Sequence, residues 1–322
     1  MHAEQFWRRH RRDVRRLGLE QEPGIGQLCT VIRRQRPAVH RVFHRAVGDG
    51  LAHRFGRLRE VLLRPADDAR YGLQAFAFNA LSNLQVPPIA PPCFDDETVA
   101  RLRPCLRPGD VLLTRTERNL TSAILPGFWI HTVVYLGRAE DLERMGIADR
   151  PIIRDHWEDI LSGARYGCVV HAISPHVIIC PLETCLKVDH VAVLRPRFEE
   201  AERANAITES LRHVGKRYNW EFDFNESQRI VCTGVIYRSY HGRGPITFSL
   251  VKHLGRFALT CDELCAQALP PEAGRDAPPP FDLAALVLQA ADGRPHVIQD
   301  AAALEHLRAM QGGMRPSRDL RV

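Results

Sequence analysis

Cysteine and histidine are the residues whose positions in this sequence favour catalysis. Of nine cysteines, Cys232 is distinctive because it lies in the first turn of an apolar helical segment, VCTGVIYRSY, after Asp223, Asn225 and Ser227, which are residue types of loops and helix caps. A thiol in the first turn of a helix lies at the positive end of the helix dipole, which lowers its pKa and favours the nucleophilic thiolate. The alternative interpretation is that Cys232 is a small buried hydrophobic residue, the usual environment of a free cysteine.

Two of the 15 histidines are candidates for the base that a cysteine nucleophile needs. His131 begins the predicted strand HTVVYLG, and His171 lies within the predicted strand CVVHAI. Because alternate residues of a strand share one face, adjacent pairing of these strands would bring both imidazoles to one surface, as a base and the group that orients it. The alternative is that each is a core histidine with satisfied hydrogen bonds.

Other groups of potential ligands lack the spacing of a metal or nucleotide site. His40 and His44 lack the intervening glutamate of a zinc protease, and neither a Walker A sequence nor a GxGxxG that opens a helix occurs. Two cysteine pairs lack the spacing of a zinc ribbon: Cys180 with Cys185, and Cys261 with Cys265. We therefore expect neither a metal nor another cofactor.

Short strands and two helices must position these residues. Residues 199–215 predict a helix with a buried apolar stripe from Ala204 to Val214, and a second helix begins near Cys232. Segments rich in Val and Ile predict five strands, at residues 110–114, 131–137, 168–173, 177–180 and 189–195. The pattern indicates a mixed domain of strands and helices.

Arginine is concentrated at the N-terminal end. Residues 1–60 contain 14 arginines and six acidic residues, which gives this segment a net charge of +8. The whole chain has a net charge of +6, so the remaining residues carry −2. We expect an Arg-rich helical region over 1–90, a catalytic domain over 91–270, and a Pro-rich linker with a short helical tail over 271–322. No apolar run of 18 residues and no secretory h-region occurs, so we expect a cytoplasmic protein that is peripheral to a membrane at most.

Four blocks of sequence, in this order, resemble the permuted NlpC-type papain-like cysteine amidases of the YaeF/YiiX group. They are Gly109-Asp110-Val111-Leu112; His131-Thr132-Val133-Val134; Val169-Val170-His171-Ala172 with Pro181-Leu182; and Gly215 to Asn219 followed by Cys232-Thr233-Gly234-Val235. The resemblance covers roughly residues 105–270. It implies an α+β fold, in which a permuted papain-like core packs an antiparallel β-sheet on helices, with the N-terminal helices as an extension.

The resemblance also implies a role for each residue of a triad. Cys232 is the implied nucleophile, His131 the general base, and His171 the group that orients His131. Members of the group more often have Glu at the third position, whereas related enzymes use His, so Glu183, just after Pro181-Leu182, is a second candidate for this role. Tyr218 and Trp220 are close enough in sequence to Cys232 to contact substrate, although aromatic residues at such places are as often part of the core.

These residues predict a cysteine hydrolase of the amidase or peptidase type that forms a covalent acyl-enzyme. The alternatives are an acyltransferase that uses the same triad on lipid or amine substrates, and a catalytically silent protein that binds a membrane surface. We expect a small acylated, peptide or lipid substrate, and an anionic membrane surface is a candidate partner of the N-terminal helices. We expect no nucleic-acid partner, because aromatic residues are not interleaved with the basic ones.

Overall fold

The computed structural model describes residues 93–116, 127–219, 224–253, 256–269, 278–290 and 293–311. The expected N-terminal helices, Trp220 and most of the Pro-rich segment after residue 270 lie outside these residues. The chain divides into two compact units. The seven-stranded sheet and the helices below belong to the unit formed by Ala90–Glu117, Gly127–Val251 and Phe257–Val322, whereas Lys252–Arg256 belong to the other unit.

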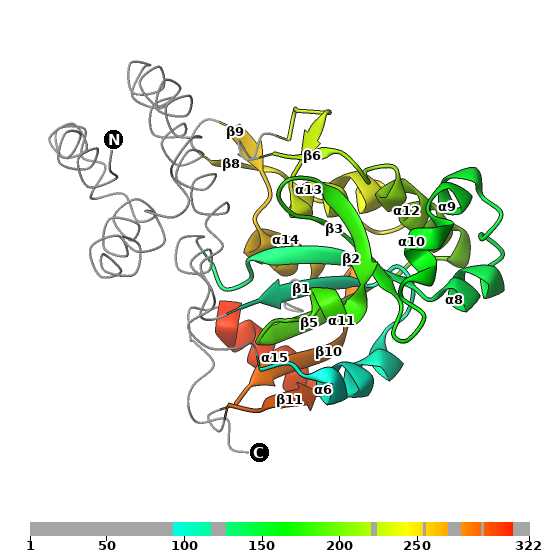
Figure 1. Cartoon of the computed structure of the whole chain (residues 1–322). Helices are drawn as coiled ribbons and strands as arrows, with labels where there is room; N and C mark the ends of the chain where they lie inside the picture. The colour runs from blue at the N-terminus through cyan, green and yellow to red at the C-terminus, as the bar shows by residue number, and fades with distance from the viewer. Residues whose placement is uncertain are drawn as a thin grey trace, which may run out of the picture. The chain divides into compact units, whose positions relative to one another are not determined.

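A seven-stranded antiparallel sheet with the strand order β11-β10-β5-β1-β2-β3-β4 forms the centre of this unit (Figure 1). The five strands expected from sequence are all present, each within one residue of its predicted ends. The strands are β1 (Val111–Arg115), β2 (His131–Gly137), β3 (Cys168–Ala172), β4 (Val177–Pro181), β5 (His190–Pro196), β10 (Phe281–Gln289) and β11 (Pro295–Ile298).

Helices cover both faces of the sheet, which confirms the α+β class (Figure 1). One core contains side chains of α8 (Ala139–Arg144), α9 (Pro151–Asp155), α10 (Trp157–Leu161), α12 (Glu200–Leu211), α13 (Cys232–Tyr240), α14 (Cys261–Ala268) and α15 (Asp300–Gln311). The opposite core contains side chains of α6 (Asp96–Leu102) and α11 (Leu182–Cys185). Short elements complete the description: the 3-10 helix η2 (Arg103–Cys105), the parallel pair β6 (Arg217–Tyr218) and β7 (Arg229–Ile230), and the two-stranded sheet of β8 (Val251–His253) and β9 (Arg256–Ala258).

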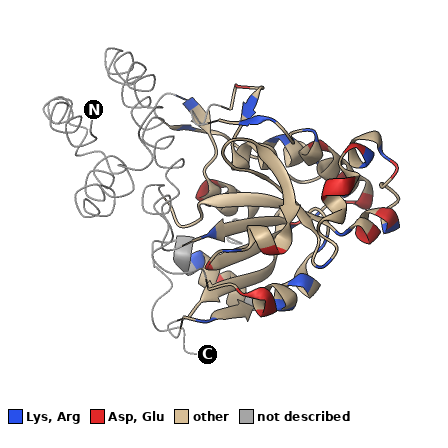
Figure 2. Ribbon diagram, in the orientation of Figure 1, with Lys and Arg blue, Asp and Glu red and all other residues tan. Residues whose placement is uncertain are grey.

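Strand alternation explains why the sheet has two buried faces. Val111 and Leu113 of β1 lie in the core with α12 and α13, whereas Leu112 between them lies in the core with α6 and α11. Both faces are apolar, so the strands read as nearly continuous runs of Val, Leu and Ile rather than alternating with charged residues. The charged residues lie mainly on the helices and turns around the sheet (Figure 2).

The C-terminal part differs from the expected linker and helical tail. Residues 281–289 and 295–298 form β10 and β11, which extend the sheet from β5, and α15 is the helical part that follows. The segment FDLAALVLQ is rich in Ala and Leu, which favour helices, and it lacks the alternation of a half-exposed strand. Pairing with β5 and burial of Leu286, Val287 and Leu288 override that local preference.

Gly109 and Asp110, which precede β1, connect three parts of the fold. The buried Asp110 carboxylate accepts hydrogen bonds of 3.0 and 2.8 Å from Nε and Nη2 of Arg195 on β5. Gly109 has a φ of 85°, its N–H donates to the Tyr135 carbonyl of β2, and its carbonyl accepts from the Tyr240 hydroxyl at the end of α13. This turn therefore joins β1, β2, β5 and α13.

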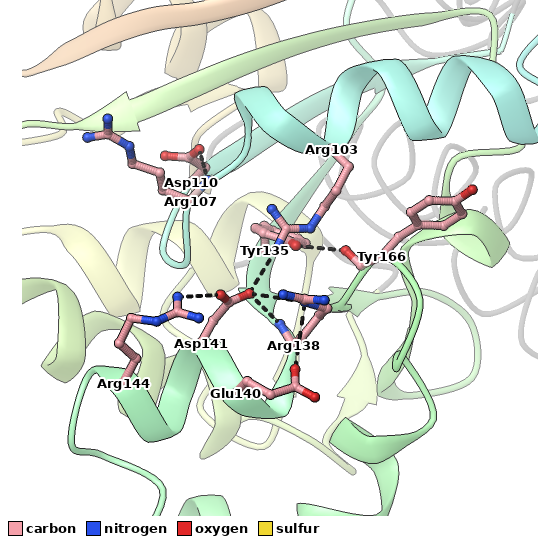
Figure 3. Close-up of polar contacts among 9 residues, drawn as sticks. All are labelled: Arg103, Arg107, Asp110, Tyr135, Arg138, Glu140, Asp141, Arg144 and Tyr166. Carbon is pink, nitrogen blue, oxygen red and sulfur yellow. Dashed lines mark hydrogen bonds and ion pairs between the residues drawn. The ribbon is translucent and has the colours of Figure 1, made fainter.

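A second polar cluster holds the turn that follows β2 (Figure 3). Asp141 of α8 accepts hydrogen bonds of 2.9 Å from the side chains of Arg103 and Arg144, and one of 3.0 Å from the backbone N–H of Arg138. The Asp141 side chain is 9% exposed. Its partners come from η2, from α8 and from the residue between β2 and α8, so this carboxylate fixes the end of β2 opposite to His131.

The Asp110–Arg195 pair yields a test of the fold. We expect Asp110→Asn to lower the free energy of unfolding by about 3 kcal/mol, because it leaves the mostly buried Arg195 guanidinium without its counter-charge. Urea denaturation of the full chain measures this. Asp282→Asn is the matched control, since the Arg197–Asp282 pair is about half exposed and its loss should cost well under ~1 kcal/mol. Equal losses in the two variants would contradict the structural role of Asp110.

His213, after α12, yields a prediction of pH dependence. It is 3% exposed, neither ring nitrogen has a hydrogen-bond partner among the described residues, and burial, together with the charges of Lys216 and Arg238, lowers its pKa from 6.5 to about 4. As the pH falls, the unfolded chain therefore binds a proton at His213 before the folded chain does. The free energy of unfolding should decline by about 3 kcal/mol between pH 6.5 and pH 4. Urea denaturation at pH 7, 5 and 4 should show a smaller decline in the free energy of unfolding for His213→Phe than for the wild-type chain. Equal declines in the two proteins would contradict the role of His213.

Candidate active site

His131 and His171 lie side by side at the start of β2 and within β3. The two strands pair in antiparallel register with Val133 opposite His171, which is the adjacent pairing expected from their alternation. Nε2 of His131 lies 3.1 Å from Nδ1 of His171, and the two rings are inclined at 66°. His171 is buried and His131 is half-buried, so the pair joins the core of the sheet to its accessible end.

Cys232 is the first residue of α13, which packs against β2 and β3. Three groups stabilise its thiolate: the Cys261 thiol, the His131 side chain and the backbone N–H of Thr132. Hydrogen bonding from Cys261 is the largest effect, and together with the other two it outweighs burial and holds the pKa of Cys232 well below its usual value. Because His171 occupies Nε2 of His131, the ring nitrogen left to face the thiol is Nδ1.

The start of α13 also has backbone donors that no side chain caps. Val231 occupies the N-cap position and makes no side-chain hydrogen bond to the first turn. The N–H groups of this turn have no carbonyl partner within the helix, so they can donate to an oxygen that becomes negatively charged beside Cys232. The local sequence thus supplies a thiolate and donors at one helix end.

Cys261 is a neighbour of Cys232 that the sequence analysis did not place in the site. It is the first residue of α14, where Thr260 accepts a hydrogen bond from the Glu263 N–H and Glu263 accepts one from the Thr260 N–H. Hydrogen bonding to the Cys232 sulfur and burial raise the pKa of Cys261 well above its usual value, so Cys261 is a neutral thiol donor. A Thr-x-x-Glu capping box around a cysteine at a helix start was the available sequence evidence.

Asp262, the next residue of α14, holds the segment that leads into His131. Its carboxylate accepts hydrogen bonds of 2.7 Å from the Phe128 N–H and 2.8 Å from the Trp129 N–H. The first turn of α14 therefore contacts the nucleophile through Cys261 and fixes the approach to the base through Asp262.

The remaining predicted site residues have different placements. Tyr218 on β6 pairs in register with Ile230, and burial followed by the nearby Cys232 and Cys261 sulfurs raises the pKa of its hydroxyl, so it lies next to the thiols. Trp220 lies outside the described residues. Glu183 is on α11, and within the described part of the chain its buried Oε2 has no hydrogen-bond partner, whereas His171 is the group that contacts Nε2 of His131.

Two further statements concern the described residues as a whole. No group of three or more His, Cys, Asp or Glu side chains in this part of the chain is arranged to hold a metal ion. No helix in it combines the length and the apolar character that crossing a bilayer requires.

Comparison with known proteins identifies the family. The model of the permuted papain-like amidase enzymes of the YaeF/YiiX type matches residues 105–275, more than half of the chain. The chain belongs to this family. All four sequence blocks that resemble the YaeF/YiiX amidases lie within the match, as do Cys232, His131 and His171. The protein is therefore an enzyme of the papain-like class, a cysteine hydrolase related to the YaeF/YiiX amidases.

Other comparisons add little to this assignment. A crystal structure described as metalloprotein yiiX from Escherichia coli is 15% identical over 62% of this chain and 91% of that chain, with a TM-score of 0.33. This similarity is too low to transfer residue roles. No curated protein matches the chain.

The Asp262 contacts predict an effect on the YaeF/YiiX-type site at a distance from the thiol. Asp262→Asn keeps one acceptor oxygen but places an amide against a backbone N–H, so the segment before His131 should shift. We expect the rate of Cys232 alkylation by iodoacetamide at neutral pH to fall about tenfold, since sub-ångström errors in position are costly at such sites. Asp149→Asn, at a side chain that is 93% exposed, is the control. Equal rates of Cys232 alkylation in folded Asp262→Asn and Asp149→Asn would contradict a role of Asp262 in positioning His131.

Proposed function

We propose that the protein hydrolyses an amide bond of a peptide-like substrate, with Cys232 as nucleophile, His131 as general base and His171 as the residue that orients His131. The observation that supports this proposal most strongly is the convergence of an imidazole, a neutral thiol and a backbone N–H on the Cys232 sulfur at the start of a helix. Amide cleavage is the reaction of the family to which the chain belongs.

The first half of the reaction forms the acyl-enzyme. Nδ1 of His131 takes the proton of the Cys232 thiol, and the thiolate attacks the carbonyl carbon of the amide. The N–H groups in the first turn of α13 donate to the oxygen that becomes negative, and His131 then gives the proton to the departing amine. The C–N bond breaks as the thioester forms, so the amine leaves neutral.

The second half returns the enzyme to its starting state. Water gives a proton to His131 and attacks the thioester carbon, which releases a carboxylic acid and the Cys232 thiolate. His171 restrains the ring of His131 through both steps by its hydrogen bond to Nε2. An imidazole in this place orients His131 without the negative charge that a carboxylate would provide.

A labelling experiment tests the nucleophile. Iodoacetamide rates, mapped to peptides across pH 4–10, should show Cys232 reacting with an apparent pKa below ~8.5, the value of free cysteine. Cys261→Ala should move that apparent pKa upwards, because the sulfur loses the hydrogen bond that stabilises its thiolate most. Cys168→Ser is the matched control, since Cys168 is a buried thiol of β3 whose pKa burial raises to about 11.

Turnover completes the test. A panel of N-acyl and peptidyl aminocoumarin amides should yield a fluorescent amine with the wild-type chain and with Cys168→Ser, and none with Cys232→Ala. Mass spectrometry of the second product separates hydrolysis, which gives the free acid, from transfer of the acyl group to an added amine or lipid. Labelling and turnover that persist in Cys232→Ala would overturn the proposal.

A further inference from the structure

A fourth side chain continues the line of contacts that starts at Cys232. The Cys180 sulfur on β4 lies 3.4 Å from Nε2 of His171, and Nδ1 of the same ring lies 3.1 Å from Nε2 of His131. Cys180 and His171 are 8% and 7% exposed. The two imidazoles therefore lie between the sulfur atoms of Cys232 and Cys180, and the Cys185 sulfur lies 4.0 Å from Nδ1 of His171.

The register of the sheet sets this arrangement. Strands β3 and β4 pair with Val169 opposite Cys180, and His171 follows Val169 on the same face. Cys180 is thus a diagonal neighbour of His171, at a separation within reach of a histidine ring. The sulfur and the ring are held by the sheet itself rather than by a loop.

The contacts restrict where the protons lie. A neutral imidazole has one N–H and one lone pair, so a His171 that donates from Nε2 to sulfur must accept at Nδ1. Nε2 of His131 then carries the hydrogen, and Nδ1 of His131 presents its lone pair to Cys232. The opposite arrangement would place the lone pair of His131 against His171, away from the thiol that it must deprotonate.

The surroundings of Cys180 favour a negative sulfur. The Cys185 thiol of α11 donates a hydrogen bond to it, and with His171 and His131 this outweighs burial and lowers the pKa of Cys180 to about 5. The other titratable groups on the elements packed against β4 are Cys168 on β3, a buried thiol that stays protonated because burial raises its pKa to about 11, Glu183 on α11, half-buried, and Glu158 and Asp159 on α10, both exposed. Cys185 stays protonated, since the same contact raises its pKa.

We propose that Cys180 is a positioning residue of this amidase: its sulfur, as a thiolate, accepts the Nε2 hydrogen of His171 and so fixes the tautomer of both histidines. The inference rests on the proposed roles of Cys232 and His131. The negative charge of Cys180 lies where a Ser-His-Asp triad has its carboxylate, at the far end of the line of contacts, and it stabilises the positive charge that develops when His131 takes the proton of Cys232. No bond to Cys180 forms or breaks.

Variants at position 180 separate charge from shape. Cys180→Ser keeps a hydrogen-bond acceptor without the charge, and Cys180→Asp supplies a carboxylate. We expect Cys180→Ser to move the apparent pKa of Cys232 alkylation up by about one pH unit, and to slow alkylation at pH 6 about tenfold. Cys180→Asp should recover most of this loss. Cys168→Ser, a serine at another buried cysteine of the same sheet, should leave the profile unchanged. A Cys180→Ser profile that matches Cys168→Ser would overturn the proposal.

The unmodified chain provides a measurement that does not depend on the folding of variants. Long-range ¹H–¹⁵N spectra of protein labelled at histidine nitrogen report which ring nitrogen carries hydrogen, and loss of one signal in His171→Gln assigns His171. We expect the Nε2–H tautomer at neutral pH. An Nδ1–H tautomer would overturn the proposal.

The two proposals fail in different ways. If Cys232 shows no labelling below pH 8.5 and Cys232→Ala keeps full turnover, the nucleophile is wrong whatever the tautomer of His171. If Cys232 reacts and turns over substrate as expected but the Cys180→Ser profile is unchanged, only the role of Cys180 is wrong. Peptide mapping is essential, because Cys180 is itself a candidate for labelling at low pH.

Discussion

The buried carboxylate of Asp110 is the interaction on which the geometry of this enzyme depends most. It fixes the turn between η2 and β1 through the forked hydrogen bonds of Arg195, and Gly109 beside it holds the end of α13. Helix α13 is therefore anchored at its last residue, Tyr240, while its first residue, Cys232, lies next to β2. A displacement at the anchor would be transmitted along a rigid helix of nine residues to the nucleophile.

The site combines two kinds of support. Paired strands hold the histidines and Cys180, whose positions follow from the register of the sheet. The starts of α13 and α14 hold Cys232 and Cys261, so two helix ends meet at a pair of sulfur atoms. Each of these elements is packed into the core, which gives the reacting groups little freedom to separate.

Local patterns explain why much of this arrangement could be predicted. The alternation of HTVVYLG and CVVHAI was sufficient to place His131 and His171 on one surface, and the order of four motifs indicated the family. Contacts between distant segments were not predictable in this way. Cys261 reaches Cys232 only because the fold brings the start of α14 to the start of α13, and Cys180 reaches His171 only through the register of β3 with β4. Strand β10 also depends on a long-range partner, β5, since its sequence favours a helix.

The strand order has a consequence for where the enzyme ends as a folding unit. The family match stops at residue 275, but β5 receives its second neighbour, β10, only from residues 281–289. A chain cut at 275 would leave unpaired those backbone donors and acceptors of β5 that face β10, and would remove the fully buried Phe281 from the core. Such an exposed strand edge is a template for pairing with other molecules. The borders of the recognisable sequence are thus narrower than the borders of the sheet.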